Sequence, residues 1–175
     1  PYGRDFSCHI AQLLDFKKGH EALDLIKTEY QTIFYYKRLV AEGAKKNVYP
    51  EHDYYDMSKG NDQETDICMQ LDEEVQICDS YRPHYHEYAV NYAARYLKTL
   101  KRAAFIGGGD SMILQELLKY PDLELVVALE LDQTVVRNAF KWFHTDPHYH
   151  DDRIEWWYGD ATKSLMLLPK EYMNS

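Results

Sequence analysis

The chain has 175 residues, enough for one core or for a modest domain with a smaller one beside it. Its formal net charge of −9 argues against a nucleic-acid partner and is compatible with a cationic one. No apolar stretch approaches the roughly 20 residues that cross a bilayer, so we expect no transmembrane segment. Three scattered cysteines, Cys8, Cys68 and Cys78, lack metal-binding spacing and indicate the cytoplasm or another reducing compartment. Because the chain begins at Pro1 rather than Met, we expect its N-terminus to be missing, which leaves targeting unknown.

The first third of the chain carries weak signals for a small β unit. Residues Ile10–Leu14 start either a helix or a strand. Residues Leu23–Leu39 mix β-branched, aromatic and charged side chains, which predicts one or two strands. Residues Ala41–Asp66 form a polar insert, which we expect to be an extended loop between strands.

A hairpin and a helix follow the polar insert. Residues Ile67–Cys78 predict two strands that turn near Asp72-Glu73. The adjacent pair Glu73-Glu74 is interpreted as turn surface, because neighbouring hairpin residues point to opposite sides. Tyrosine, alanine and leucine residues at helical spacing predict a helix over Tyr85–Leu100. Residues 1–84 therefore form an N-terminal β unit, with its insert near 41–66.

Residues 85–175 are interpreted as the first half of a nucleoside-binding domain. A short apolar strand, Ala103–Ile106, leads into a triple-glycine turn and then a helix that Pro121-Asp122 ends. A second strand, Leu125–Leu129, ends in Glu130, and a third, Ile154–Trp157, precedes a Gly-Asp turn. A final short helix covers Thr162–Leu168. The predicted fold class is α/β, with a Rossmann-like parallel sheet, incomplete at the C-terminus, after a small antiparallel β unit.

The order of these elements predicts a ligand at the glycine turn. Glycines let the backbone approach a ligand where a strand turns into a helix, and an acid at the next strand end can accept both ribose hydroxyls. Asp110 and Glu130 are 20 positions apart, as expected when one helix and one strand intervene. The alternative is a structural glycine turn without a ligand. A sheet of three parallel strands leaves an exposed edge, so we expect a longer polypeptide or a second chain, as in a homodimer, to complete it.

One further segment contains several potential metal ligands. The sequence HTDPHYHDD holds three histidines among acidic residues, namely His144, Asp146, His148, His150, Asp151 and Asp152. The segment contains a proline and lacks regular ligand spacing, so we interpret it as a solvated loop and expect no metal.

Taken together, the motifs resemble those of the polyamine aminopropyltransferases, the spermidine and spermine synthases. Members carry YQ, LDGxxQ, YHE or YQE, IGGGDG, an EID strand end and a GD turn. The corresponding segments here are Tyr30-Gln31, Leu71-Asp72-Glu73-Glu74-Val75-Gln76, Tyr85-His86-Glu87, Ile106-Gly107-Gly108-Gly109-Asp110, Glu130-Leu131-Asp132 and Gly159-Asp160-Ala161. The resemblance covers roughly Leu23 to Leu168, interrupted by the polar insert.

The resemblance implies a role for each matching residue. The donor would be decarboxylated S-adenosylmethionine, a co-substrate rather than a permanently bound cofactor, and the acceptor a polyamine. Donor contacts would come from Gln31, Gln76, His86, Gly107, Asp110, Glu130, Asp160 and Ala161. Among them, Glu130 would hold the ribose, Asp110 the aminopropyl amine, and Asp160 with Ala161 the adenine. Tyr85, with Asp110, would hold the acceptor amine.

The sequence also departs from the family pattern. The glycine pair after the loop aspartate is Ser111-Met112 here, and the LDG turn reads Leu71-Asp72-Glu73. The family's catalytic aspartate, in a DxxDP-type motif, is absent from these residues, so no catalytic residue is assigned and we expect the chain alone to be inactive. Two alternatives to an aminopropyltransferase therefore remain. One is a non-catalytic family member acting as a binding or assembly subunit, and the weaker one is an S-adenosylmethionine-dependent methyltransferase.

Overall fold

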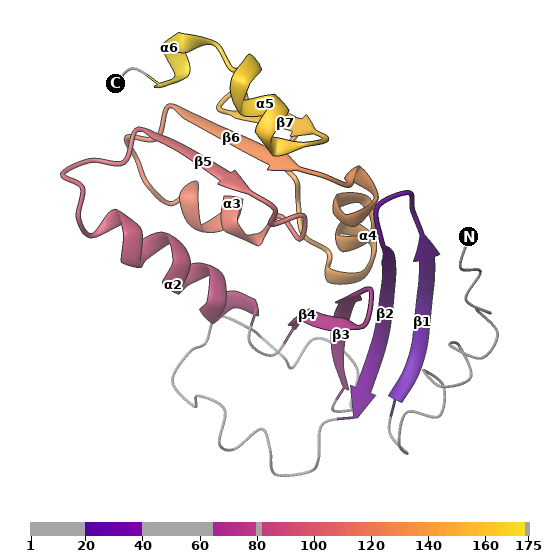
Figure 1. Ribbon diagram of the computed structural model, residues 1–175. Coiled ribbons are helices and arrows are strands. Elements are labelled where there is room, and N and C mark those ends of the chain that lie inside the picture. The colour runs from indigo at the N-terminus through magenta and orange to yellow at the C-terminus, as the bar shows by residue number, and fades with distance from the viewer. Residues whose placement is uncertain (1–19, 40–64, 80–81, 174–175) are drawn as a thin grey trace. The chain divides into compact units, whose positions relative to one another are not determined.

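The computed structural model describes residues 20–39, 65–79 and 82–173 (Figure 1). The strand or helix expected at Ile10–Leu14 and nearly all of the polar insert lie outside these residues. The chain divides into two compact units, one of residues 1–27 and 32–78, the other of residues 28–31 and 79–175. In the described part of the chain, no helix is long and apolar enough to span a membrane.

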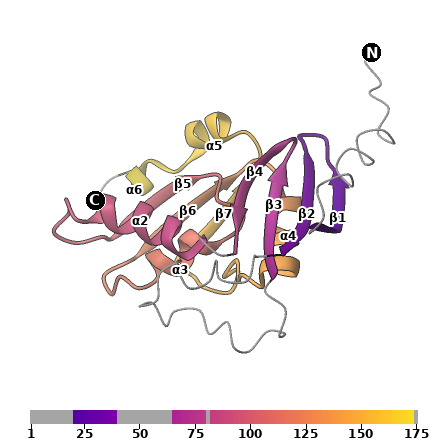
Figure 2. The same cartoon turned by 90° about the horizontal axis from the view of Figure 1, so that it is seen from below.

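The first unit is an antiparallel sheet of four strands. These are β1 (His20–Lys27), β2 (Thr32–Leu39), β3 (Thr65–Leu71) and β4 (Glu74–Cys78), in the order β1-β2-β3-β4 (Figure 2). The prediction of one or two strands over Leu23–Leu39 is thus confirmed as two, β1 and β2. The predicted hairpin is confirmed as well, because β3 and β4 are joined by the turn at Asp72-Glu73.

A disulfide lies in the core of this sheet. Cys68 and Cys78 face each other on β3 and β4, with Cα atoms 4.0 Å apart, and their sulfur atoms are bonded. They pack with Phe34 and Tyr36 of β2. This bond was not expected from cysteines that indicated a reducing compartment. A cross-link between neighbouring strands stabilises the unit mainly by restricting its unfolded chain.

The second unit begins with the helix α2 (Arg82–Ala94), which is shorter than the helix predicted over Tyr85–Leu100. The prediction was wrong at the C-terminal end. Tyr96 and Leu97 continue the helical spacing of the sequence, but both are exposed, so no packing holds them in a helix. Leu97 N–H instead donates to the Ala94 carbonyl at 2.9 Å, a tighter turn that ends α2.

The predicted parallel sheet is confirmed. It contains β5 (Arg102–Ile106), β6 (Leu125–Glu130) and β7 (Ile154–Tyr158) in the order β5-β6-β7, with all pairs parallel. The central strand β6 is almost entirely buried, as its continuous apolar run requires. Four helices follow the strands: α3 (Met112–Leu117), α4 (Gln133–Phe143), α5 (Ala161–Leu167) and α6 (Lys170–Met173).

Alternating residues of β6 face two separate apolar cores. Val126 packs with Val90 of α2 and Leu114 of α3 on one side of the sheet. Val127 and Leu129 pack on the other side with residues that include Leu168 and Tyr172, at the α5–α6 end of the chain. The unit is therefore a sheet between helical layers (Figure 1).

Candidate functional site

The glycine turn after β5 adopts a backbone that requires glycine. Gly107 and Gly108 have φ values of 82° and 74°, in the left-handed region. At Gly109, a Cβ atom would lie 2.7 Å from Val135 Cγ1 of α4 and 3.0 Å from Glu130 Oε2. The turn therefore lies directly against α4 and the end of β6, and a side chain at Gly109 would displace both.

Glu130 closes β6 beside this turn and is 7% exposed. Its Oε1 accepts the Asp132 backbone N–H at 3.0 Å. Burial raises the pKa of Glu130, while hydrogen bonds from the backbone of Asp132, Leu131 and Gly109 oppose the shift. The carboxylate is thus held by the backbone at a strand end, where an acceptor for a pair of ligand hydroxyls is expected.

Asp132, two residues further on, connects β6 to the segment of residues 28–31. Its Oδ1 accepts the Thr134 N–H at 2.9 Å and caps α4. Its Oδ2 accepts the Thr28 hydroxyl at 2.7 Å and the Gln31 amide at 3.4 Å. Burial would raise the pKa of Asp132, but these hydrogen bonds outweigh it and lower the pKa. Gln31, a predicted donor contact, therefore lies at the end of β6.

His86 and Asp110 form a buried pair between α2 and the glycine turn. His86 Nδ1 lies 2.7 Å from the Arg82 carbonyl oxygen, and Nε2 lies 3.2 Å from Asp110 Oδ1. A carbonyl oxygen only accepts, so Nδ1 is the donor to Arg82, and Nε2 is the ring atom that faces the carboxylate. The other carboxylate oxygen of Asp110, Oδ2, is buried and has no partner within the described residues.

Ser111 occupies a backbone conformation suited to glycine. Its φ is 63°, in the left-handed region, and its side chain is buried. Its hydroxyl, like Asp110 Oδ2, finds no hydrogen-bond partner among the residues that the structure describes. The side chain that replaces the family's glycine thus adds strain and an unpaired buried hydroxyl next to Asp110.

The other predicted site residues lie on α2, at the start of α5 and on β4. Tyr85 is exposed on α2, with its ring edge-on to His86 at a centroid distance of 5.0 Å. Asp160 follows β7, caps α5 through the Thr162 N–H at 2.9 Å, and precedes Ala161, the first residue of that helix. Gln76 is exposed on β4 and belongs to the antiparallel unit, so it is not placed relative to the other residues.

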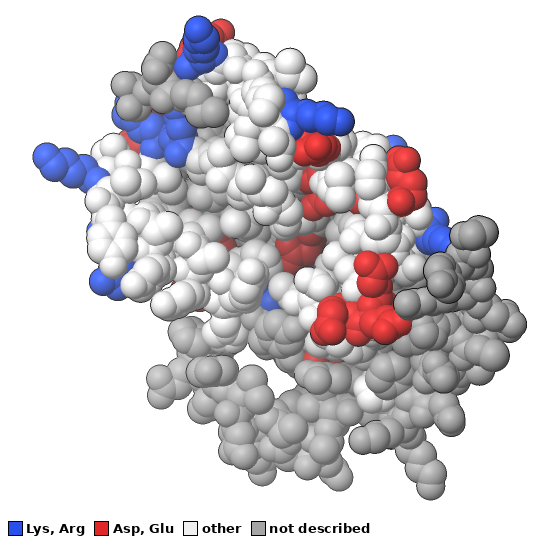
Figure 3. Space-filling model, in the orientation of Figure 1, with Lys and Arg blue, Asp and Glu red and all other residues white. Residues whose placement is uncertain are grey.

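The parallel-sheet unit therefore brings predicted residues together at the carboxyl ends of its strands. These are Gly107, Asp110, Glu130, Asp160 and Ala161, joined by His86 from α2 and Gln31 beside Asp132. The acidic side chains suit a ligand that carries ammonium groups and a ribose diol. In Figure 3, red acidic surface lies near the middle of the view. Sequence reasoning missed the roles of Thr28 and Asp132, for which the only signal was the second acid of Glu130-Leu131-Asp132.

Comparison with known proteins identifies the family. A family model described as "Spermine/spermidine synthase domain" matches residues 82–172, more than half of the chain. The chain belongs to this family. The predicted resemblance to the polyamine aminopropyltransferases is thereby confirmed, although the match begins only at α2.

Curated relatives agree with this assignment. A polyamine aminopropyltransferase of Thermoanaerobacter sp. (strain X514) is 40% identical over 80 residues, which are 45% of this chain and 29% of the relative. One of Xanthomonas oryzae pv. oryzae (strain PXO99A) is 31% identical over 102 residues, 58% of this chain and 36% of the relative. The chain thus spans roughly a third of these relatives' length.

The fold is also that of solved family structures. Spermidine synthase from Thermotoga maritima matches with a TM-score of 0.62 at 19% identity, over 82% of this chain and 43% of that chain. A spermidine synthase in complex with the transition state analogue AdoDATO matches with a TM-score of 0.63 at 18% identity, over 84% and 42%. The predicted fold class, a Rossmann-like sheet after a small antiparallel unit, is confirmed.

Proposed function

We propose that the chain carries the donor-binding part of an aminopropyltransferase of polyamine biosynthesis. The donor is decarboxylated S-adenosylmethionine, and the acceptor is a polyamine. In this reaction an amine attacks a carbon next to a sulfonium, so the site needs carboxylates for the ammonium groups and a carboxylate for the donor's ribose. Family membership supports the reaction type, and the carboxylates at the strand ends support the ligand.

The observation that carries this proposal is the position of Glu130. Its carboxylate is buried at the end of β6, oriented by backbone N–H groups, and lies 3.0 Å from the place where a Cβ on Gly109 would be. Desolvation raises the pKa of this buried carboxylate, so additional hydrogen-bond donors would stabilise its ionised form. A ribose offers two such hydroxyl groups. The bare backbone of Gly107 beside it, with nothing within 4 Å of a Cβ position, leaves room for the ligand.

The donor's amine is assigned to Asp110. Its Oδ2 is buried without a partner in the described part of the chain, and such a carboxylate oxygen is stabilised by an ammonium group. Tyr85, exposed next to His86, is the proposed contact for the acceptor amine. Asp160 and Ala161, at the start of α5, are the proposed adenine contacts, and Gln76 stays a predicted donor contact.

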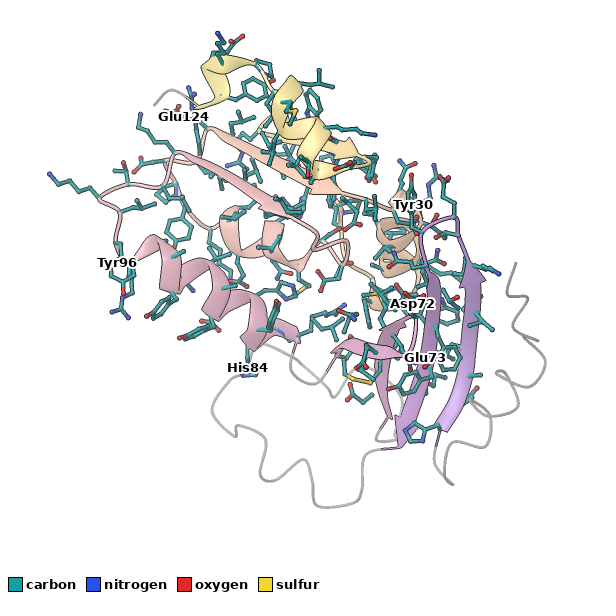
Figure 4. All side chains as sticks on the ribbon, viewed as in Figure 1. Tyr30, Asp72, Glu73, His84, Tyr96 and Glu124 are labelled. Atoms are coloured by element: carbon teal, nitrogen blue, oxygen red, sulfur yellow. A yellow bond between two sulfur atoms is a disulfide. The ribbon has the colours of Figure 1, made fainter. Side chains whose placement is uncertain are left out.

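Calorimetric titration with methylthioadenosine tests the nucleoside site. Replacing Glu130 by Ala removes the ribose acceptor, so Glu130→Ala should weaken binding by about 2 kcal/mol. The matched control is Glu124→Ala, because Glu124 is exposed just before the same strand and pairs with Lys101 at 2.8 Å (Figure 4). Equal affinity in wild type and Glu130→Ala, or no binding by the wild type, would remove the nucleoside role.

A second candidate is a non-catalytic family member that binds or assembles without turnover. Ser111 favours it, because a left-handed serine with an unpaired buried hydroxyl stands where the family has glycine. The two candidates differ in their response to restoring glycine. The assay is product formation from decarboxylated S-adenosylmethionine and a polyamine, run on the longer polypeptide that carries the catalytic aspartate. If the wild type forms no product and a Ser111→Gly/Met112→Gly double variant does, the protein is the non-catalytic family member, whereas product formation by the wild type supports the enzyme.

A further inference from the structure

Three side chains of the loop between α4 and β7 converge outside the proposed donor site. Asp146, His148 and His150 each offer one ligand atom, and these atoms all lie within 4.8 Å of one another. Asp146 Oδ2 and His148 Nδ1 are 3.8 Å apart, too far for a hydrogen bond, and the rings of His148 and His150 have centroids 6.1 Å apart. Asp146 and His148 thus lie side by side without a direct hydrogen bond between these two atoms.

An unusual backbone brings these residues together. His148 has a φ of 53°, in the left-handed region, which costs a non-glycine residue about 1 kcal/mol or more. Its N–H donates to Asp146 Oδ1 at 2.7 Å, and its carbonyl accepts the Asp151 N–H at 3.0 Å. This turn orients the carboxylate and both imidazoles, and it is the reason why the spacing in the sequence did not indicate a site.

The residues between these ligands fasten the loop to the rest of the unit. The buried Pro147 accepts the indole N–H of Trp156 at 2.8 Å through its carbonyl oxygen. The hydroxyl groups of Tyr149 and Tyr158 are 2.6 Å apart. Odd-numbered residues therefore hold the loop against β7, and even-numbered residues carry the potential ligands. A loop fixed in this way has already lost much of the conformational freedom that ligand binding would otherwise cost.

The donor set selects the class of ion. Two imidazoles and one carboxylate suit zinc and its neighbours in the transition series, whereas Mg²⁺ and Ca²⁺ prefer oxygen ligands alone. Tetrahedral zinc, with bonds of about 2.0–2.2 Å, places its ligands about 3.4 Å apart. Side-chain rotations that move the ligand atoms by about 1 Å would bring the three atoms to that spacing, and water would fill the remaining position.

We propose that Asp146, His148 and His150 form a binding site for a zinc-type divalent transition-metal ion. The ion braces the loop between α4 and β7 and takes no part in the chemistry at Glu130. The proposal does not depend on the proposed function, because none of its ligands lies at the carboxyl end of a strand.

Titration of the full chain with Zn²⁺, followed by calorimetry, tests the site, with Co²⁺ as a spectroscopic probe of coordination. We expect one ion per chain, at least tenfold weaker binding in His148→Asn and in His150→Ala, and d–d bands of bound Co²⁺ that both variants lose. Asn at 148 tolerates the left-handed backbone. Asp146→Asn keeps an acceptor for the His148 N–H but removes the charge, and should also weaken binding at least tenfold.

The matched control is His144→Asn, because His144 is also left-handed, with a φ of 55°, but stands outside the cluster. It should bind Zn²⁺ like the wild type, and Zn²⁺ should raise the thermal midpoint of this control but not of His148→Asn. Circular dichroism verifies that each variant folds. Unchanged affinity in His148→Asn and His150→Ala, or an equal loss in His144→Asn, would show that surface histidines bind the ion nonspecifically and would overturn the proposal.

Discussion

His86 Nε2 lies 3.2 Å from Asp110 Oδ1, and both side chains are 4% exposed. His86 also contacts the Arg82 carbonyl one helical turn earlier, which fixes the orientation of the ring. Asp110 is therefore shared between an imidazole of this chain and the donor amine that we assign to it. A protonated imidazole would compete with an ammonium group for this carboxylate, whereas a side chain that cannot be protonated would not.

Replacing His86 by Gln should change the affinity for amine-bearing ligands selectively. Gln keeps an N–H donor for Asp110 but cannot take up a proton, so this side chain cannot act as a cation that competes with the ammonium of decarboxylated S-adenosylmethionine. We expect about tenfold tighter binding of that donor at neutral pH. Methylthioadenosine, which lacks the aminopropyl amine of the donor, is the control, and its affinity should be unchanged. A parallel gain for both ligands would contradict the competition.

Glu130 should make the stability of the chain fall as the pH rises. Burial raises the pKa of Glu130 in the folded protein above the ordinary value of 4.5. Between these two values the folded state binds more protons than the unfolded state, so the free energy of unfolding decreases with rising pH. Urea unfolding from about pH 4 to pH 7 should show this component in the wild type and not in Glu130→Gln. The same slope in both would disprove it.

Relieving the left-handed serine should affect both stability and binding. Ser111→Gly removes backbone strain and the unpaired buried hydroxyl, so we expect stabilisation by about 1 kcal/mol in thermal or urea unfolding. The donor should also bind more tightly, since the backbone beside Asp110 becomes accessible. His144→Gly removes similar strain at the exposed end of α4. This control should gain stability without a change in donor affinity. If His144→Gly also bound the donor more tightly, the gain in Ser111→Gly would not come from the backbone beside Asp110.

The Thr28 hydroxyl should stabilise the chain more while Asp132 is ionised. Thr28→Val removes the 2.7 Å hydrogen bond to Asp132 Oδ2 and should cost about 1–2 kcal/mol at neutral pH. The pKa of Asp132 is lowered in the folded state, so its contribution exists above the ordinary value of 3.8 and is lost as the pH falls through the folded value. Urea unfolding should therefore show a smaller difference near pH 3. Thr28→Ser, which keeps the hydroxyl, should resemble the wild type at both pH values.

The elements that were predicted correctly are determined by residues that are adjacent in the sequence. The apolar run Leu125–Leu129 has no polar break, and it became β6, buried on both faces. The turn at Asp72-Glu73 lies between two runs of strand-forming residues and joins β3 to β4. The site residues carried by the glycine turn and by the end of β6 were predicted in the same way, because each lies at a fixed offset from a strand.

The parts that were missed depend on residues far apart in the sequence or on single backbone angles. Thr28 reaches Asp132 across 104 positions, and nothing local to either residue indicates the contact. The helix predicted to Leu100 ends at Ala94 because tertiary packing, not spacing, decides where it stops. The convergence of Asp146 and His148 follows from one left-handed residue, which the sequence spacing does not reveal.

Trp156 stacks on Tyr158 with a centroid distance of 5.7 Å and lies in the strand next to β6. All three tryptophans of the chain, Trp142, Trp156 and Trp157, belong to the parallel-sheet unit. Tryptophan emission therefore follows the unfolding of that unit. The antiparallel sheet contains no tryptophan, so its unfolding is followed by circular dichroism. Recording both signals during one unfolding experiment shows whether the two units melt as one cooperative block, with no label or substitution added to the chain.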